Sequence, residues 1–232
     1  MKLQELLTQL FPNGCDVATN GWLVTGEATS GGKPVSVLGT TDHVLIGVRE
    51  TMVLADKLLE IVEQHPGRPI VLLVDNDGQR LALVEELLAL PEYFAHLLRV
   101  QRLAYLSGSK LVAILYGNAV AGGFIAFGML ADRLVSISGA EPSVMKLEAI
   151  LRVTKMPLEK LTSLATTVPV FAPGSDNFFK MGGLYEIWTD HFADHLHRLI
   201  QSDLSKDLRA GLGQERGGRT ASKAIIDEII AA

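Results

Sequence analysis

The chain has 232 residues, 48% of them hydrophobic and 20% charged, enough for one substantial core or two small ones. This composition excludes a disordered or collagen-like chain. Because 26 acidic residues outnumber 21 lysines and arginines, the net charge of -5 argues against a nucleic-acid-binding protein. The only cysteine, Cys15, excludes an intramolecular disulfide and a cysteine-based zinc site, and predicts a cytoplasmic protein.

The first segments predict a short helix followed by a small sheet. The N-terminus, MKLQELLTQLFPNG, carries Glu5 inside its apolar stretch and lacks a signal-peptide cleavage site, so we expect an amphipathic helix. Segments rich in β-branched residues then predict short strands at 21–28, 33–40 and 43–48. Apolar residues at helical spacing predict a helix from Thr51 to Gln64.

The middle of the chain predicts an α/β architecture. The run PIVLLVD at 69–75 lacks the polar alternation of a one-sided sheet, so we expect a strand covered on both faces by helices. Strand, crossover and strand then recur. The elements expected after it are a loop at 76–79, helices within 83–106 broken near Pro91, and strands at 111–116 and 133–138.

The last third predicts mostly helices. We expect helical structure from Pro142 to about Ala165, then an irregular stretch at 168–183, a short strand at 184–188 and a helix from Asp190. Residues 211–220 have the composition of a flexible connector before a final helix at 222–232. No repeat or domain boundary is evident, so we expect a single domain over 1–232 with a helical tail at about 203–232.

One uncharged stretch, from Leu111 to Ala131, is long enough to span a bilayer as a helix. Several glycines interrupt it, however, and its start has the composition of a strand. We therefore predict a buried strand from Leu111 to Tyr116, a turn at Gly117-Asn118, and a buried helix from Ala121 to Leu130, and no membrane span.

Glycine-containing turns follow two of the predicted buried strands, at 74–79 and 116–124. Such turns expose backbone N–H groups, which can hold an anion or a carbonyl oxygen that becomes anionic during a reaction. The glycines could equally serve only to let strand and helix pack closely. Neither turn carries the Lys-Ser/Thr pair of a Walker loop or a GxGxxG sequence, which argues against nucleotide binding.

Other chemistries have weaker support. No GxSxG elbow occurs, and Ala121 stands where a serine nucleophile of a Clp-type peptidase would be. His191, Asp194 and His195 have the spacing of metal ligands on a helix, but no third histidine or cysteine ligand is evident and an apolar stripe beside them favours a solvated flank, so we expect no metal. Several cations flank the expected site and could meet phosphate or carboxylate groups. They are Arg80, Lys110, Lys146, Arg152 and Lys155.

Taken together, several longer motifs resemble the gamma subunit of malonate decarboxylase, a family related to the carboxyltransferase subunits of acetyl-CoA carboxylase. The resemblance covers most of the chain. The motifs are VDNDGQ (74–79), EELLAL (85–90), YGNAVAGGFIAFGMLADR (116–133), AEPSVM (140–145), RVTKMP (152–157), PVFAPG (169–174), MGG (181–183) and Trp188.

This resemblance implies the crotonase fold, an α/β fold of repeated ββα units, in which two backbone N–H groups form an oxyanion hole. It implies decarboxylation of a malonyl thioester, together with a homologous beta subunit, to give acetyl thioester and carbon dioxide. The thioester would be carried on the CoA-like prosthetic group of an acyl carrier subunit, loaded by an acyl-carrier transferase subunit, with no cofactor bound by this chain.

By position, the resemblance makes Gly122 and Gly123 the expected donor pair, with Gly78 and Gln79 on the opposing edge of the hole. Ala121, Asn118 and Arg152 are the expected substrate-binding residues. Asn76-Asp77 and Ala121 depart from the family pattern, where hydroxyl residues would be unsurprising. Two alternatives stay open, a biotin-dependent carboxyltransferase subunit and a non-catalytic assembly subunit of the same complex.

Overall fold

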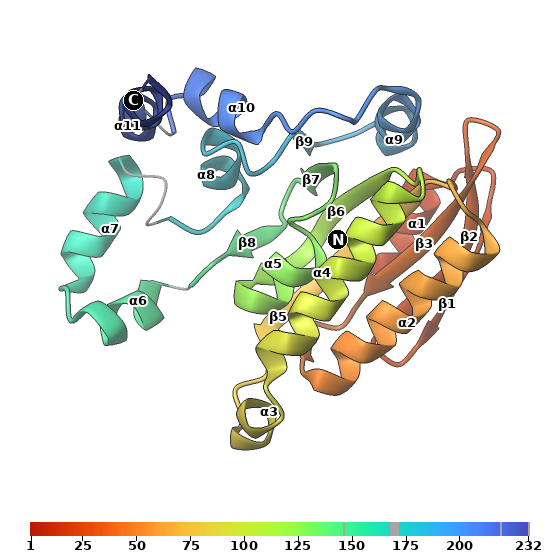
Figure 1. The fold of residues 1–232 in the computed structure, drawn as a ribbon, viewed down its shortest axis with the longest axis horizontal. Helices are drawn as coiled ribbons and strands as arrows, with labels where there is room; N and C mark the ends of the chain where they lie inside the picture. The colour runs from red at the N-terminus through yellow and green to blue at the C-terminus, as the bar shows by residue number, and fades with distance from the viewer. Residues whose placement is uncertain (146, 168–171, 219, 232) are drawn as a thin grey trace.

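The computed structural model describes residues 1–145, 147–167, 172–218 and 220–231. In this part of the chain, strands form one mixed sheet in the order β1-β2-β3-β5-β6-β7-β9, with β4 added to β5 and β8 to β6 (Figure 1). The strands are β1 Cys15–Asn20, β2 Leu23–Ser30, β3 Lys33–Thr40, β4 Val44–Ile46, β5 Ile70–Gln79, β6 Leu111–Val120, β7 Arg133–Ile137, β8 Glu141–Ser143 and β9 Glu186–Trp188.

The predicted α/β architecture is confirmed. β3, β5, β6, β7 and β9 run parallel, while β1, β2 and β3 form an antiparallel meander at one edge. Residues 70–74 of β5 and 112–115 of β6 are completely buried, as an apolar run covered on both faces requires. Strand β1 was not predicted, because its sequence CDVATN is polar and its side chains stay largely exposed.

The strands β5 and β6 continue beyond their apolar runs, and here the sequence prediction was wrong. Residues 76–79 and Gly117-Asn118, expected as a loop and a turn, belong to the strands. After a register shift between Val74 and Asn76, β5 pairs with β4, and β6 pairs with β8 from Asn118. These short neighbouring strands supply hydrogen-bond partners, so the polar segments remain extended.

Helices cover the sheet as the periodicity indicated (Figure 1). Helices α2 (Val48–Gln64) and α4 (Leu90–Leu106) pack side by side, and α5 (Ala121–Phe127) lies against β5 and α4. The break predicted near Pro91 is confirmed, with α3 (Leu83–Leu87) before it. Helix α5 ends at Phe127 rather than Leu130, with Gly128 as its C-cap. Helix α1 (Leu3–Leu10) is confirmed as amphipathic and packs near α9 (Phe192–Gln201).

The C-terminal third is helical, with local differences from the prediction. Part of the expected irregular stretch, 168–171, lies outside the described residues, and α8 (Ser175–Lys180) is a helix within the remainder. Part of the predicted flexible connector belongs to α10 (Arg209–Glu215). The N–H of its first residue, Arg209, donates to the Asp207 carboxylate. Helices α6 (Leu147–Thr154) and α7 (Leu158–Thr167) extend away from the sheet, and α11 (Thr220–Ala231) follows α10 (Figure 1).

The uncharged stretch that raised the question of a membrane span is split between β6 and α5. In the described part of the chain, no helix is both long and apolar enough to cross a bilayer.

Replacing Phe124 by alanine tests how strongly α5 is anchored. Phe124 is fully buried and meets Phe178 edge to face, with ring centroids 5.8 Å apart. We expect Phe124→Ala to lower the free energy of unfolding by about 3–5 kcal/mol, measured by urea denaturation. The neighbouring Ile125 is 41% exposed, so Ile125→Ala is the control and should change the value by less than about 0.5 kcal/mol. Equal effects of the two substitutions would contradict this account.

Candidate functional site

The end of β5 and the start of α5 converge, as the two glycine motifs suggested. The Gly122 N–H donates to Gln79 Oε1 at 2.8 Å. A Cβ placed on Gly123 would lie 2.9 Å from the Gly78 carbonyl carbon, so the two backbones are in close contact. The structure therefore brings together the four residues expected to form an oxyanion hole, Gly78, Gln79, Gly122 and Gly123.

Side-chain amides of the chain itself occupy two of these N–H groups. Gly78 donates to Asn76 Oδ1 at 3.1 Å, as Gly122 does to Gln79 Oε1. Asn76 is fully buried, and its Nδ2 has no hydrogen-bond partner among the described residues. Sequence reasoning missed Asn76, because a polar residue at the end of an apolar strand was interpreted as part of a loop. A substrate oxygen that used these N–H groups would replace amide oxygens.

Ala121 stands at the junction of β6 and α5 with a backbone φ of 48°. This left-handed conformation is uncommon for a residue other than glycine and costs of order 1–3 kcal/mol, which makes an observed outlier a pointer to function. The tight turn lets Gly122 follow directly with its N–H at the junction. The Ala121 methyl group offers no nucleophile, which disfavours the peptidase alternative.

The predicted substrate-binding residues are separated in the structure. Asn118 lines a different hollow of about 830 Å³, bounded by the end of β6, the loop before β4 and the N-terminal residues. Arg152 is exposed on α6, one of the helices that extend away from the sheet (Figure 1), and forms no hydrogen bond or ion pair with described residues of the convergence. Only Ala121 of this group adjoins Gly122.

The hollow contains a histidine–carboxylate pair that the sequence analysis did not identify. His43 Nδ1 lies 2.6 Å from Asp75 Oδ1, and the His43 N–H donates to Asp75 Oδ2 at 3.1 Å. The Asn118 N–H also donates to Asp75, at 2.9 Å. Because a carboxylate only accepts, Nδ1 is the donor and Nε2 is the free ring nitrogen. The two residues are 32 positions apart, and the only sequence signal was an acidic residue ending an apolar run.

Tyr116 borders the same hollow. Its hydroxyl donates to the Thr40 carbonyl at 2.8 Å, and burial, with Asp75 and Asp42 nearby, raises the pKa of this phenol above its ordinary value. The hydroxyl therefore stays protonated and supports the end of β3 next to the His43–Asp75 pair.

The described residues contain no cluster of three or more His, Cys, Asp or Glu side chains that could hold a metal. His191, predicted within a helix, instead precedes α9 as its left-handed N-cap. Its Nδ1 is 3.9 Å from Asp194 Oδ2, and both side chains are exposed. The metal-ligand spacing of these residues on one helix therefore does not carry over to the structure, because His191 lies outside α9.

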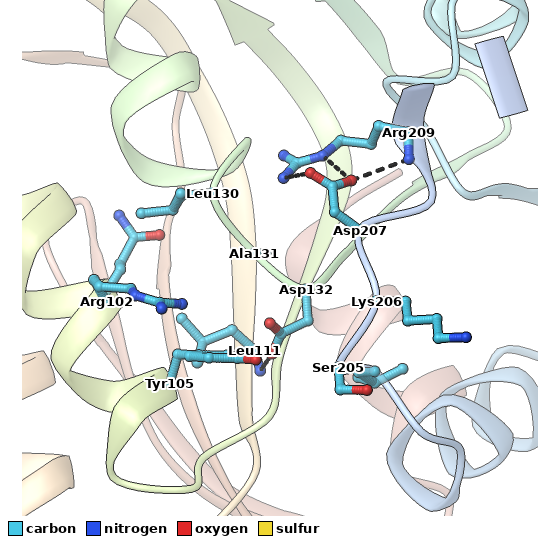
Figure 2. Close-up of a pocket in the computed structure, with 12 residues that line it drawn as sticks. Arg102, Tyr105, Leu111, Leu130, Ala131, Asp132, Ser205, Lys206, Asp207 and Arg209 are labelled. Carbon is cyan, nitrogen blue, oxygen red and sulfur yellow. Dashed lines mark hydrogen bonds and ion pairs between the residues drawn. The ribbon is translucent and has the colours of Figure 1, made fainter. Parts of the chain in front are cut away.

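Another hollow, of about 190 Å³, lies at the amino-terminal ends of β6 and β7, where it is lined mainly by charged and polar side chains (Figure 2). Asp132 accepts the Leu111 N–H at 2.8 Å, and Arg209 is held by Asp207. None of the expected site residues lies here. Parallel α/β sheets bind ligands at the carboxyl ends of their strands, where the glycine convergence is, so we assign this hollow no part in the site.

The fold and this convergence define the class of protein. The architecture matches crotonase-like carboxyltransferase structures, among them the transcarboxylase 12S core with methylmalonyl-coenzyme A and methylmalonic acid bound, with a TM-score of 0.71 at 17% identity over 86% of this chain and 41% of that chain. Residues 41–232 match the family described as malonate decarboxylase gamma subunit. The chain belongs to this family.

Individual relatives agree with this assignment. The chain is similar to a Pseudomonas malonate decarboxylase hetero-tetramer structure in complex with coenzyme A, with a TM-score of 0.79 and 22% identity over 97% of both chains. It is 30% identical over 182 residues to the malonyl-S-ACP:biotin-protein carboxyltransferase MADD of Malonomonas rubra. That match covers 70% of this chain and 62% of the length of the relative.

Substituting Gly123 tests the close contact between α5 and β5. The alanine Cβ would lie 3.0 Å from both Asn76 Oδ1 and the Gly78 carbonyl oxygen, so backbone must shift. We expect Gly123→Ala to lower the free energy of unfolding by about 1–3 kcal/mol in urea denaturation. Gly211 in α10 has open space at its Cβ, so Gly211→Ala should be neutral or stabilising by up to about 1 kcal/mol. A neutral Gly123→Ala would show that the contact is loose.

Burial raises the pKa of the Asp132 carboxyl, although the Leu111 N–H and nearby arginines oppose the shift. Folding therefore favours the neutral form, and this group lowers stability as the pH rises through its folded-state pKa. Asparagine keeps an acceptor without the charge. We expect the free energy of unfolding of Asp132→Asn to gain on the wild type between pH 4 and pH 7, both values measured by urea denaturation. A difference independent of pH would contradict the inferred burial cost.

Proposed function

We propose that this chain is the gamma subunit of a malonate decarboxylase that, with a homologous beta subunit, decarboxylates a malonyl thioester held on an acyl carrier subunit. The products are acetyl thioester and carbon dioxide. The observation that carries the proposal is the close approach of the Gly78 and Gly123 backbones at the carboxyl edge of the sheet, where the Gly78 and Gly122 N–H groups donate to Asn76 Oδ1 and Gln79 Oε1. Membership of the malonate decarboxylase gamma subunit family supports it.

The chemistry needs stabilisation of negative charge on an oxygen. Loss of carbon dioxide leaves an electron pair on the α-carbon, delocalised onto the thioester oxygen as an enolate. Preorganised N–H donors stabilise such an oxyanion, and removing one donor of this kind costs about 3–4 kcal/mol of transition-state stabilisation. In this proposal the enolate oxygen takes the places now held by Asn76 Oδ1 and Gln79 Oε1. Asn118 and Arg152 lie away from the glycine convergence. They would contact the substrate only after a rearrangement of this chain or across an interface with a partner subunit.

Exposed apolar surface near this edge supports a hetero-oligomer. Helix α3 and its flanks present Leu81, Leu83 and Leu87 with 82%, 75% and 77% of their surface exposed. Apolar groups clustered in this way mark interaction sites. Helix α11, at the opposite end of the molecule from α3 (Figure 1), is a separate apolar surface with Ile229 and Ile230 at 70% and 79% exposure. We propose the beta subunit as the partner of the α3 surface. The complex would also include a carrier subunit, whose CoA-like arm brings the acyl group, and a transferase that loads it.

A second candidate is a carboxyltransferase subunit that passes the carboxyl group to biotin. The similarity to a relative described as a malonyl-S-ACP:biotin-protein carboxyltransferase favours it. Both reactions pass through the same enolate, so the described geometry supports both. The fate of the carboxyl group separates them.

The experiment is co-expression of this chain with the homologous subunit, purification of the complex, and measurement of carbon dioxide release from a malonyl thioester with and without a biotin carrier. Release without biotin is the expected result. Activity only when biotin accepts the carboxyl group would replace the proposal by the second candidate.

A well-formed complex without either activity would overturn the catalytic proposal and leave an assembly subunit. The control is this chain assayed without the partner subunit. It should release no carbon dioxide, because the proposal needs both chains.

A further inference from the structure

We infer that the His43–Asp75 pair supplies the proton that converts the thioester enolate into the acetyl product. This inference rests on the proposed function. The overall reaction consumes a proton, yet the residues at the glycine convergence, Asn76, Gln79 and Ala121, have no side chain that titrates. Among the titratable groups near that edge, Asp77 accepts a hydrogen bond from Asn118 Nδ2 at 2.6 Å, and His43 pairs with Asp75.

The pair has the geometry of an acid–base group. Asp75 is only 4% exposed, and it accepts hydrogen bonds from His43 Nδ1 at 2.6 Å and from the Asn118 backbone at 2.9 Å. The carboxylate on Nδ1 fixes the orientation of the ring and leaves Nε2 to exchange a proton. The His43 side chain is 56% exposed, so it remains accessible.

The backbone holds the ring in place. Asp42 and His43 have φ values of 59° and 51°, two consecutive residues in the left-handed region. Such conformations persist where the surroundings fix them, and here the His43 N–H is also bound to Asp75. The imidazole is therefore preorganised by its main chain and its side chain.

The hollow that holds the pair lies next to the segment of β5 that carries Gly78, although Gly78, Gln79, Gly122 and Gly123 do not line it. It is lined by Asn118, an expected substrate-binding residue, and its volume of about 830 Å³ can accommodate an acyl group together with water. Asn118 Nδ2 donates at 2.6 Å to Asp77 Oδ1, and Asp77 immediately precedes Gly78. Proton transfer operates across a direct hydrogen bond or through one water, which the hollow provides room for.

The step balances without any further reactant. The bond between the α-carbon and the carboxylate breaks, carbon dioxide leaves, and its bonding electron pair stays on the enolate. The α-carbon then forms a bond to the proton from His43 Nε2. The neutral imidazole regains a proton from solvent. In reverse, the same group removes an α-hydrogen from the acetyl thioester.

The test follows that reverse step in the assembled complex. Exchange of the α-hydrogens of an acetyl thioester with deuterium oxide is measured by mass spectrometry for the wild type and His43→Gln, alongside carbon dioxide release. We expect exchange to fall about 100-fold or more in His43→Gln, and added imidazole to restore part of it. His96→Gln, on α4, is the matched control and should exchange like the wild type. Unfolding midpoints of both variants confirm the fold.

The outcomes separate the inference from the proposed function. Carbon dioxide release with exchange unaffected by His43→Gln overturns the inference alone. His43-dependent exchange without carbon dioxide release supports the acid–base pair and overturns the decarboxylase proposal. Loss of exchange that imidazole does not restore assigns His43 a structural role and also overturns the inference, and a wild-type complex that shows neither reaction overturns both.

Discussion

A buried carboxylate holds the functional edge of the sheet together. Asp75 ends the apolar part of β5, and its side chain binds His43 from the loop before β4 and the backbone of Asn118 in β6. Its own N–H donates to Thr40 Oγ1 at the end of β3. A buried charge without partners costs several kcal/mol, so these donors must converge for the fold to form. The backbone and side chain of this one residue thereby fix β3, the loop before β4, β5 and β6 together.

The same constraint explains where the glycines lie. Asp75 joins β5 to β6 at the shift in their pairing register, and both strands continue beyond it as extended chain toward Gly78 and the start of α5. The Gly122 N–H, at the junction of β6 and α5, donates to Gln79, and the Gly78 N–H donates to Asn76. Buried backbone donors need acceptors. A substrate oxygen that took over these donors would leave the displaced amide oxygens to find other partners, at a cost of about 1–3 kcal/mol for a buried group such as Asn76.

The sequence was informative where the physics is local. The apolar run of β5 and the helical spacing of α2 predicted the α/β layers, and the glycine motifs predicted the convergence at Gly122. It failed where partners are distant along the chain. Residues 76–79 have a loop composition, yet β4 pairs with them. The His43–Asp75 pair joins segments that no motif connects. Arg152, expected as a cation that meets the substrate, lies on α6, whose position no local pattern determines.

The exposure of apolar side chains on α3 has a similar cause, a network of buried polar contacts. Arg80, directly after Gln79, pairs with Glu50 at 3.1 Å and Glu85 at 3.5 Å, and Glu85 also accepts the Val48 N–H. Glu85 is 5% exposed, and its carboxylate accepts the N–H of the first residue of α2, which joins α3 to α2. Leu83 and Leu87 therefore cannot turn inward without breaking this network. Their exposure is built into the fold, beside the glycine convergence, and a partner that covered them would also close the site to water, where oxyanion-stabilising donors act most strongly.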